Sequence, residues 1–222
     1  MSKTVELTAS DGHRLSAYVA EPAGKPRGGI VVIQEIFGVN SHIRSVADGY
    51  AADGYLVVAP AIFDRVTRGY ETGYNPPDIQ KGMEFVGKLS MDDVLKDASA
   101  AVEYAKAAGK VGLVGFCYGG TVAWVASARV SGLAAVVAYY GGNIPNFIKE
   151  QPKVPALLHF GEKDQHPSPD QARAVVAAHP EVQAHFYDAG HGFNCDHRGS
   201  YDAAAATLAR QRSLEFFRQH VG

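Results

Sequence analysis

Gly115-Phe116-Cys117-Tyr118-Gly119-Gly120 places one thiol between glycines in this 222-residue chain. It follows the apolar run 110–114, which predicts a short buried strand, and precedes the run 121–128, which predicts a packed helix. Glycines on both sides of Cys117 allow the tight reversal that must join them. The pattern G-x-C-x-G predicts a nucleophile elbow with a thiol in place of the usual hydroxyl. The alternative is that Cys117 is a small buried packing residue.

Two more reactive side chains follow strand-like segments downstream of this elbow. The apolar segment 154–160 runs into a polar turn that holds Asp164, and the alternating segment 182–187 runs into a turn that holds His191. The chain order of nucleophile, acid and histidine is that of α/β hydrolases. We therefore predict a triad of Cys117, Asp164 and His191. Taken alone, Asp164 could be a turn carboxylate and His191 an ordinary surface histidine.

Each member of the predicted triad has a chemical role. His191 is expected to take the thiol proton and later to protonate the leaving oxygen, while Asp164 holds the imidazole in the useful tautomer. The position of Cys117 at a helix N-terminus, beside an imidazolium, favours the thiolate that attacks. The backbone N–H of Tyr118 is expected to be one oxyanion-hole donor.

A fourth element of the predicted site lies upstream. The β-branched run 30–33 predicts a central strand, and the loop after it is expected to supply the second oxyanion-hole donor, the N–H of Ile36. Glu35 would then lie close to Cys117, where a carboxylate opposes formation of the thiolate. This predicts a nucleophile held in check until substrate arrives. Alternatively, Glu35 forms a structural salt bridge with Arg44 or another nearby cation.

The segment 34–40, the elbow, Asp164 and the sequence His191-Gly192-Phe193 together resemble the dienelactone hydrolase family over essentially the whole chain. Members of this family are cysteine-nucleophile α/β hydrolases, and those that give it its name open the lactone ring of dienelactones to give maleylacetate. The resemblance implies the triad named above. It also implies a resting state in which the thiol is paired with Glu35 until substrate binding frees it.

The chain departs from that family where substrate is chosen. Dienelactone hydrolases hold the substrate carboxylate with two arginines, and the second of their positions is occupied here by Cys195. The segment that would hold the first, 77–89, contains no arginine. The cations that could substitute are Arg65, Arg68, Lys81 and Arg198. The resemblance therefore implies the class of reaction, but it does not specify the substrate.

Aromatic residues near these segments are candidates for the substrate pocket. The run 69–77 has the glycine, proline and tyrosine content of a long loop. Its Tyr70 and Tyr74 could stack on a flat ligand while Arg68 pairs with an acid group, or the loop could be a solvent-exposed connection. Phe37 and Tyr118 are expected to be pocket walls, because each adjoins a predicted oxyanion donor.

No cofactor is expected. Cys195 forms the pattern H-x₃-C-x-H with His191 and His197, but this spacing matches no standard zinc site, so no metal is predicted. Neither G-x-G-x-x-G nor a Walker motif is present, which argues against a bound nucleotide. Two cysteines do not make a disulfide framework, although oxidation could join Cys117 to Cys195.

Composition supports one globular enzyme domain spanning residues 1–222. The chain is 46% hydrophobic and 20% charged, enough to bury a full core. Its formal net charge of −2 and the lack of a basic block argue against nucleic acid and anionic membranes as partners. The N-terminus lacks an apolar signal core, so a cytoplasmic location is expected. The expected partner is a small ester or lactone, and the expected assembly is a monomer or weak dimer.

The predicted fold class is α/β: a mostly parallel, doubly wound sheet of about 7–8 strands with helices on both faces. Segments 4–9 and 15–21 predict a hairpin. Further strands are predicted near 29–35, 55–60, 110–115, 133–140, 154–160 and 182–187. Helices are predicted over 90–108, from Ser168 onward, and over 203–221. The region 63–89 has the least regular pattern.

The function that the sequence favours is hydrolysis of an ester or enol lactone through a thioester, without a metal. A carboxylesterase or thioesterase with the same triad and another substrate is the close alternative. A different class also stays open: a non-hydrolytic binding or redox-responsive protein in which Glu35 keeps the thiol silent.

Overall fold

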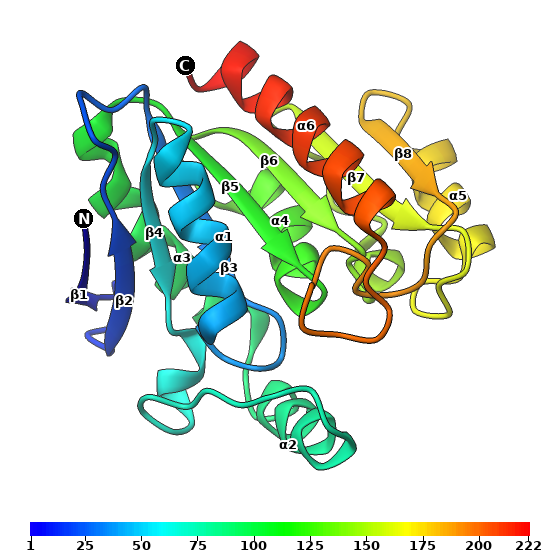
Figure 1. Ribbon diagram of the computed structural model, residues 1–222, viewed down its shortest axis with the longest axis horizontal. Coiled ribbons are helices and arrows are strands. Elements are labelled where there is room, and N and C mark those ends of the chain that lie inside the picture. The colour runs from blue at the N-terminus through cyan, green and yellow to red at the C-terminus, as the bar shows by residue number, and fades with distance from the viewer.

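One eight-stranded sheet runs through the protein in a computed structural model that covers residues 1–222 (Figure 1). The strand order is β1-β2-β4-β3-β5-β6-β7-β8. Strand β2 is antiparallel to both of its neighbours, and all other pairs are parallel. The strands are β1 (Ser2–Thr8), β2 (Arg14–Ala20), β3 (Gly29–Ile33), β4 (Leu56–Pro60), β5 (Val111–Phe116), β6 (Leu133–Tyr139), β7 (Ala156–Gly161) and β8 (Gln183–Tyr187). The predicted mostly parallel sheet is confirmed.

Six helices cover the two faces of this sheet and part of its edge. They are α1 (Ser41–Ala52), α2 (Pro76–Val86), α3 (Met91–Ala105), α4 (Tyr118–Arg129), α5 (Pro169–Ala178) and α6 (Ala203–His220). Helices α1 and α6 share one apolar cluster, and α3, α4 and α5 contribute to the cluster on the opposite face. Figure 1 shows α1 and α6 in front of the strands and α3 and α4 behind them.

The central strands are apolar on both faces because helices cover both. Every residue of β3 and β5 is buried, as are all those of β7. Strands of a parallel sheet bury both faces and therefore read as continuous apolar runs. The β-branched run at 30–33 and the elbow strand at 111–116 have this pattern, which is why the sequence identified them.

Helix boundaries follow the expected capping residues. The Ser90 side chain accepts a hydrogen bond from the N–H of Asp93 at the start of α3. Ser168 and Gln171 form a capping box at the start of α5. Each of these side chains satisfies an N–H that has no partner within the helix. The predicted helix start at Ser168 is confirmed, with Ser168 as the N-cap of α5. The predicted final helix is also confirmed, as α6.

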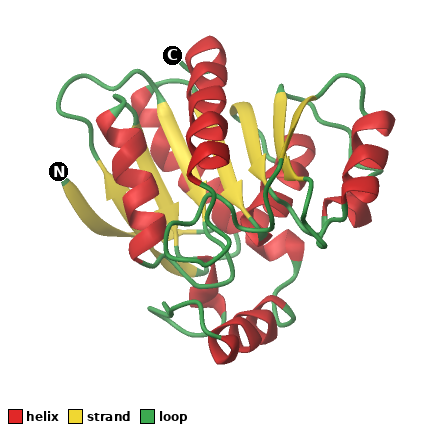
Figure 2. Ribbon diagram, turned by 45° about the vertical axis from the view of Figure 1, so that its right-hand side comes forward, coloured by secondary structure: helices red, strands yellow, loops and turns green.

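The least regular predicted region contains a helix that the sequence analysis did not identify. Helix α2 begins within the run 69–77 that was interpreted as a long loop, and the loop proper ends at Asn75. The Asp78 carboxylate accepts a hydrogen bond from the Asn75 N–H, which fixes this start. Figures 1 and 2 place α2 beyond the edge of the sheet, beside the loops that follow the strands. Only Gly82 and Phe85 of α2 are buried, so most of this helix is not covered by the rest of the protein.

The parallel strands end along one edge, and the segments that follow β3, β5, β7 and β8 meet there. In such sheets, ligands bind beyond the carboxyl ends of the strands. None of the helices combines the length and the apolar character that a membrane span requires.

Candidate active site

The turn between β5 and α4 has the backbone of a nucleophile elbow. Cys117 is the N-cap of α4 and has φ 54° and ψ −113°, a conformation that non-glycine residues rarely adopt. A Cβ on Gly115 would lie 1.8 Å from the carbonyl oxygen of Gly119. A Cβ on Gly119 would lie 2.4 Å from the carbonyl oxygen of Ile33. The strained turn therefore depends on glycine at both positions, and it presents the thiol at the end of the central strand.

Three side chains from separate segments meet at this turn. The Nε2 atom of His191 lies 3.1 Å from the Sγ atom of Cys117. Its Nδ1 atom lies 2.8 Å from Oδ2 of Asp164. The other carboxylate oxygen of Asp164 accepts a hydrogen bond from the His166 N–H at 2.8 Å. The structure thus brings the three predicted triad residues together in the order thiol, imidazole, carboxylate, which is the geometry of a nucleophile, a base and an orienting acid.

The electrostatics of this group favour a protonated imidazole. Burial of His191 disfavours its charged form, but the negative charge of a Cys117 thiolate and the hydrogen bond to Asp164 outweigh burial and raise its pKa to about 10. A carboxylate accepts only, so the Nδ1 atom of His191 carries the proton directed at Asp164. In the neutral ring, Nε2 is then free to accept the proton of the thiol.

Two backbone N–H groups beside the thiol have no acceptor within the protein. Ile36 follows β3, Tyr118 begins α4, and neither residue donates a backbone hydrogen bond. The first N–H groups of a helix have no partner inside it, which accounts for Tyr118. Both residues line the same cavity as Cys117. Free N–H groups in such a place can stabilise an oxyanion.

Glu35 is buried in the loop between β3 and α1. Its Oε1 atom lies 3.4 Å from Nη1 of Arg198, and its Oε2 atom is buried without a hydrogen-bond partner. The salt bridge to Arg44 that the sequence left open does not form, because Arg44 pairs with Glu71. Arg198 is instead the nearby cation that pairs with this carboxylate. The thiol is paired with His191, and no hydrogen bond joins it to Glu35 as the family resemblance implied.

A cavity of about 670 Å³ opens above the thiol. Its reactive end is formed by Cys117, Asp164 and His191. The walls include Phe37 and Tyr118, as well as the cationic side chains of Lys163 and Arg198. The guanidinium of Arg198 lies 5.7 Å from the centre of the Phe37 ring. A cavity of this size holds a small organic ligand.

Four of the predicted substrate-binding residues lie away from this cavity. Arg68 pairs with Glu6 at the surface, and Lys81 pairs with Glu84 on the exposed side of α2. Tyr70 packs its ring against Phe85, and Tyr74 packs against Phe37 from outside the cavity. Arg65, also considered as a substitute, forms a two-bond pair with buried Asp97. Of the candidate cations, the structure brings only Arg198 to the thiol's cavity.

The sequence analysis missed the apolar wall that α2 supplies. Ile79, Met83 and Val86 line the cavity, at spacings of four and three residues that define one helix face. That spacing was the available signal, but the glycines and prolines before it obscured it. A Cβ on Gly82 would lie 2.2 Å from the carbonyl oxygen of Ile36, so α2 contacts the loop after β3 backbone to backbone.

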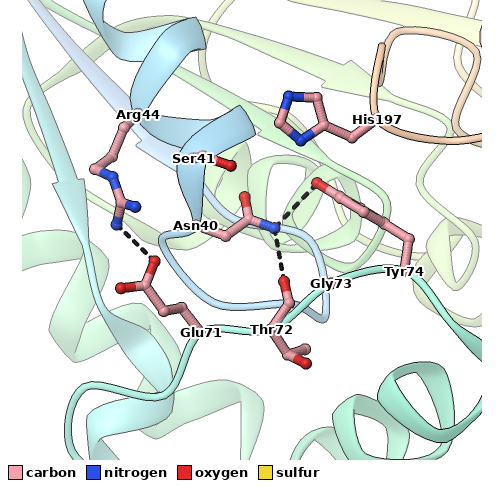
Figure 3. Close-up of a pocket in the computed structure, with 8 residues that line it drawn as sticks. All are labelled: Asn40, Ser41, Arg44, Glu71, Thr72, Gly73, Tyr74 and His197. Carbon is pink, nitrogen blue, oxygen red and sulfur yellow. Dashed lines mark hydrogen bonds and ion pairs between the residues drawn. The ribbon is translucent and has the colours of Figure 1, made fainter.

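A second hollow, of about 310 Å³, lies beside the start of α1 (Figure 3). Asn40 donates hydrogen bonds to the Thr72 carbonyl and to the Tyr74 hydroxyl, as the dashed lines show. Arg44 and Glu71 form an ion pair across one side, and the His197 ring lies on the other. These polar contacts hold the loop before α2 against α1.

Cys195 is fully buried next to this second hollow. One ligand atom each of Cys195, Glu35 and His42 lie within 4.8 Å of one another. Burial and the charge of Glu35 raise the pKa of the Cys195 thiol to about 11. The pairing of Cys195 with His191 that the pattern H-x₃-C-x-H suggested is absent, because both ring nitrogens of His191 are engaged by Asp164 and Cys117. Both cysteines are free thiols.

Comparison with known proteins agrees with this architecture. The family model described as "Dienelactone hydrolase family" matches residues 15–221. The chain is 36% identical over 231 residues to carboxymethylenebutenolidase from Pseudomonas putida, covering 97% of this chain and 96% of that one. It is 31% identical over 226 residues to carboxymethylenebutenolidase 1 from Cupriavidus pinatubonensis, with the same coverage. A crystal structure from Klebsiella pneumoniae, provisionally described as a dienelactone hydrolase, matches with a TM-score of 0.83 at 29% identity over 99% of this chain and 100% of that one.

Proposed function

The chain belongs to the dienelactone hydrolase family, and on this basis we propose that it hydrolyses a small lactone or carboxylic ester through a thioester on Cys117. The observation that carries the proposal is the position of His191, with one ring nitrogen 3.1 Å from the thiol and the other 2.8 Å from Asp164. Relatives named carboxymethylenebutenolidase favour a lactone as substrate.

The first half of the reaction acylates Cys117. The thiolate sulfur attacks the carbonyl carbon, and the carbonyl oxygen takes the negative charge while the N–H groups of Ile36 and Tyr118 stabilise it. As the tetrahedral adduct collapses, the carbon–oxygen bond of the ester breaks. His191, protonated on Nε2, gives its proton to the leaving oxygen. In a lactone, the released hydroxyl or enol remains part of the acyl group.

The second half releases the acid. Neutral His191 takes a proton from water, and the resulting hydroxide attacks the thioester carbon. The carbon–sulfur bond breaks, and the thiolate returns to its pair with the imidazolium. Asp164 keeps the ring in place through both halves and stabilises its charged form. No atom outside the substrate, water and these residues is required.

Glu35 is proposed to restrain the thiol before substrate binds. It is a buried carboxylate with Arg198 as its counter-ion, and Arg198 lines the cavity. A substrate carboxylate in the cavity would compete with Glu35 for this guanidinium. We therefore propose Arg198 as the group that holds an acidic substrate, in place of the two arginines of related dienelactone hydrolases.

The test uses an activated phenyl ester and a thiol-alkylating reagent on the same preparation. Turnover should disappear in proportion to labelling of Cys117, as measured by mass spectrometry of the intact protein. A neutral lactone and an equivalent lactone with a carboxylate then define the substrate class. If the unmodified protein turns over none of these compounds, the alternative of a binding protein with a silenced thiol replaces hydrolysis.

A further inference from the structure

We propose that Glu35, His42 and Cys195 form a binding site for one thiophilic divalent cation, of which Zn²⁺ is the best match. One ligand atom from each residue lies within 4.8 Å of the other two. Glu35 follows β3, His42 is the second residue of α1, and Cys195 lies in the loop after β8. Their exposed fractions are 1%, 3% and 0%, so the cluster is shielded from bulk water.

His42 is held in the tautomer that a metal ligand requires. Its Nδ1 atom lies 3.0 Å from the carboxylate of Asp196. Because a carboxylate accepts only, Nδ1 carries the proton, and Nε2 of the neutral ring has a free lone pair. That Nε2 atom is buried and has no hydrogen-bond partner. A carboxylate that orients a histidine through its far nitrogen is the usual support of a metal-bound imidazole.

The carboxylate of Glu35 presents a second unmatched acceptor. Oε1 faces Arg198 at 3.4 Å, while Oε2 is buried with no partner. Buried polar atoms without partners are rare in folded proteins because each loses its hydrogen bonds to water and gains none in return. Arg198 contacts only Oε1 of Glu35, so Oε2, the His42 Nε2 atom and the Cys195 thiol could share a bound cation.

The donor set selects the type of cation. Thiolate, imidazole and carboxylate are all ligands of Zn²⁺, whereas Mg²⁺ and Ca²⁺ prefer oxygen donors throughout. On binding, the Cys195 thiol would release its proton to solvent, and the charge of the cation would stabilise the thiolate that forms. Zinc binds these atoms at about 2.0–2.3 Å, so the three side chains would draw together by roughly 1 Å on binding. Three protein ligands leave a fourth position for water, as in zinc sites that are open to an exchangeable ligand.

The hollow in Figure 3 provides a route for the ion. Tyr74 and His197 line this hollow. The ring of His197 lies 5.8 Å from that of His42 and 6.1 Å from that of Tyr74, measured between centres. The buried cluster therefore lies just behind the wall of an open surface hollow. The site shares Glu35 with the proposed function, but Cys117 and His191 take no part in it, so metal binding and hydrolysis can be tested separately.

The test is cobalt and zinc binding by the whole protein after dialysis against a chelator. We expect one Co²⁺ per chain, with the intense thiolate-to-cobalt charge-transfer absorption that marks a sulfur ligand. Competition with a chromophoric chelator then gives the zinc affinity. Cys195→Ser and His42→Gln should each weaken zinc binding at least about 10–100-fold, the range known even for loss of supporting contacts. Cys117→Ser should leave both the stoichiometry and the absorption band unchanged.

Three results would overturn the proposal. They are the absence of a stoichiometric band in the wild-type protein, a band that persists in Cys195→Ser, and a band that disappears in Cys117→Ser. The last result would place the ion at the triad. If Cys195→Ser fails to fold, the test uses His42→Gln instead, and the readout is the Tm of each protein with and without zinc. Zinc should raise the Tm of the wild type by mass action and leave that of His42→Gln unchanged.

Discussion

The imidazole of His191 is the only side chain that contacts the Cys117 thiol by hydrogen bonding, with Nε2 3.1 Å from Sγ. Cys117 comes from the turn after β5, and His191 comes from the loop after β8, three strands further across the sheet. This contact makes the thiol a candidate nucleophile rather than a packing residue. The proposed chemistry begins there.

Replacing Cys117 by serine should reduce kcat for an activated ester by at least about 10³-fold. The hydroxyl is a much weaker nucleophile at neutral pH, and the longer contact to His191 would disfavour its activation. The measurement is steady-state kinetics, with alkylation followed by intact mass. Wild-type protein should take up one label per chain under native conditions, because Cys195 is fully buried. Rapid uptake of two labels would contradict this arrangement.

The activity should fall at high pH, because the imidazolium of His191 acts as the acid. Its pKa is raised from 6.5 to about 10, since the charge of Cys117 and the hydrogen bond to Asp164 outweigh burial. The proton is therefore retained well above the ordinary value and is lost as the pH rises through about 10. Protonation of His191 should likewise stabilise the fold fully below about 6.5, with this contribution lost by about pH 10.

Asp164→Asn tests the origin of that shift. Without the carboxylate, the fall in activity should move to lower pH, and kcat should decrease by about 10²–10⁴-fold. Asp188→Asn is the matched control, because Asp188 lies on the same side of the sheet but is exposed and pairs with Lys163. If the pH–rate profile of Asp164→Asn matched that of the wild type, Asp164 would not be the group that orients His191.

Glu35→Gln should accelerate alkylation of Cys117 at a given pH. The substitution keeps the shape of the side chain and removes a buried negative charge that opposes the thiolate. We expect the rate-against-pH curve for iodoacetamide to shift to lower pH, with a rate increase of up to about 10-fold near neutrality. An unchanged curve would show that Glu35 does not restrain the thiol.

Arg198→Gln should raise KM for an ester that carries a carboxylate by at least about 10-fold. Charge-assisted pairing with a carboxylate is among the stronger hydrogen bonds, and Arg198 lines the cavity. A neutral ester of the same size should show a smaller change in KM. Arg68→Gln is the control, because Arg68 forms its ion pair at the surface. Equal losses for the charged and the neutral ester would assign Arg198 to structure alone.

Gly115→Ala should destabilise the protein by about 2–5 kcal/mol, as measured by urea unfolding. Its Cβ would lie 1.8 Å from the Gly119 carbonyl, and neither the strand nor the helix can retreat without disturbing the core. Gly24→Ala is the matched control, since a Cβ at Gly24 meets nothing within 4 Å. It should change stability by less than about 0.5 kcal/mol.

The sheet could be read from the sequence because each central strand is a continuous apolar run bounded by turn residues. The proximity of Cys117, Asp164 and His191 followed from the fact that parallel strands end at one edge. Arg68 and Lys81 could not be placed in the same way. Their distance from the thiol depends on how the segment 66–89 folds back on the sheet, and no local pattern specifies that.

The cluster around Cys195 was hidden for a related reason. His42 lies on α1 and Cys195 on a distant loop, so their spacing of 153 residues forms no motif. Only the packing of α1 against the loop after β8 brings the imidazole and the thiol together. The same holds for the wall formed by Ile79, Met83 and Val86, which required α2 to be recognised as a helix.

The contact at Gly82 has a consequence for redesign of the enzyme. Because Gly82 of α2 lies against the Ile36 carbonyl, any side chain at position 82 would push the helix and the loop after β3 apart. Variation at 79, 83 and 86 instead reshapes the pocket while the loop keeps its alignment. A library aimed at new ester specificities should therefore diversify these three positions and hold Gly82 constant.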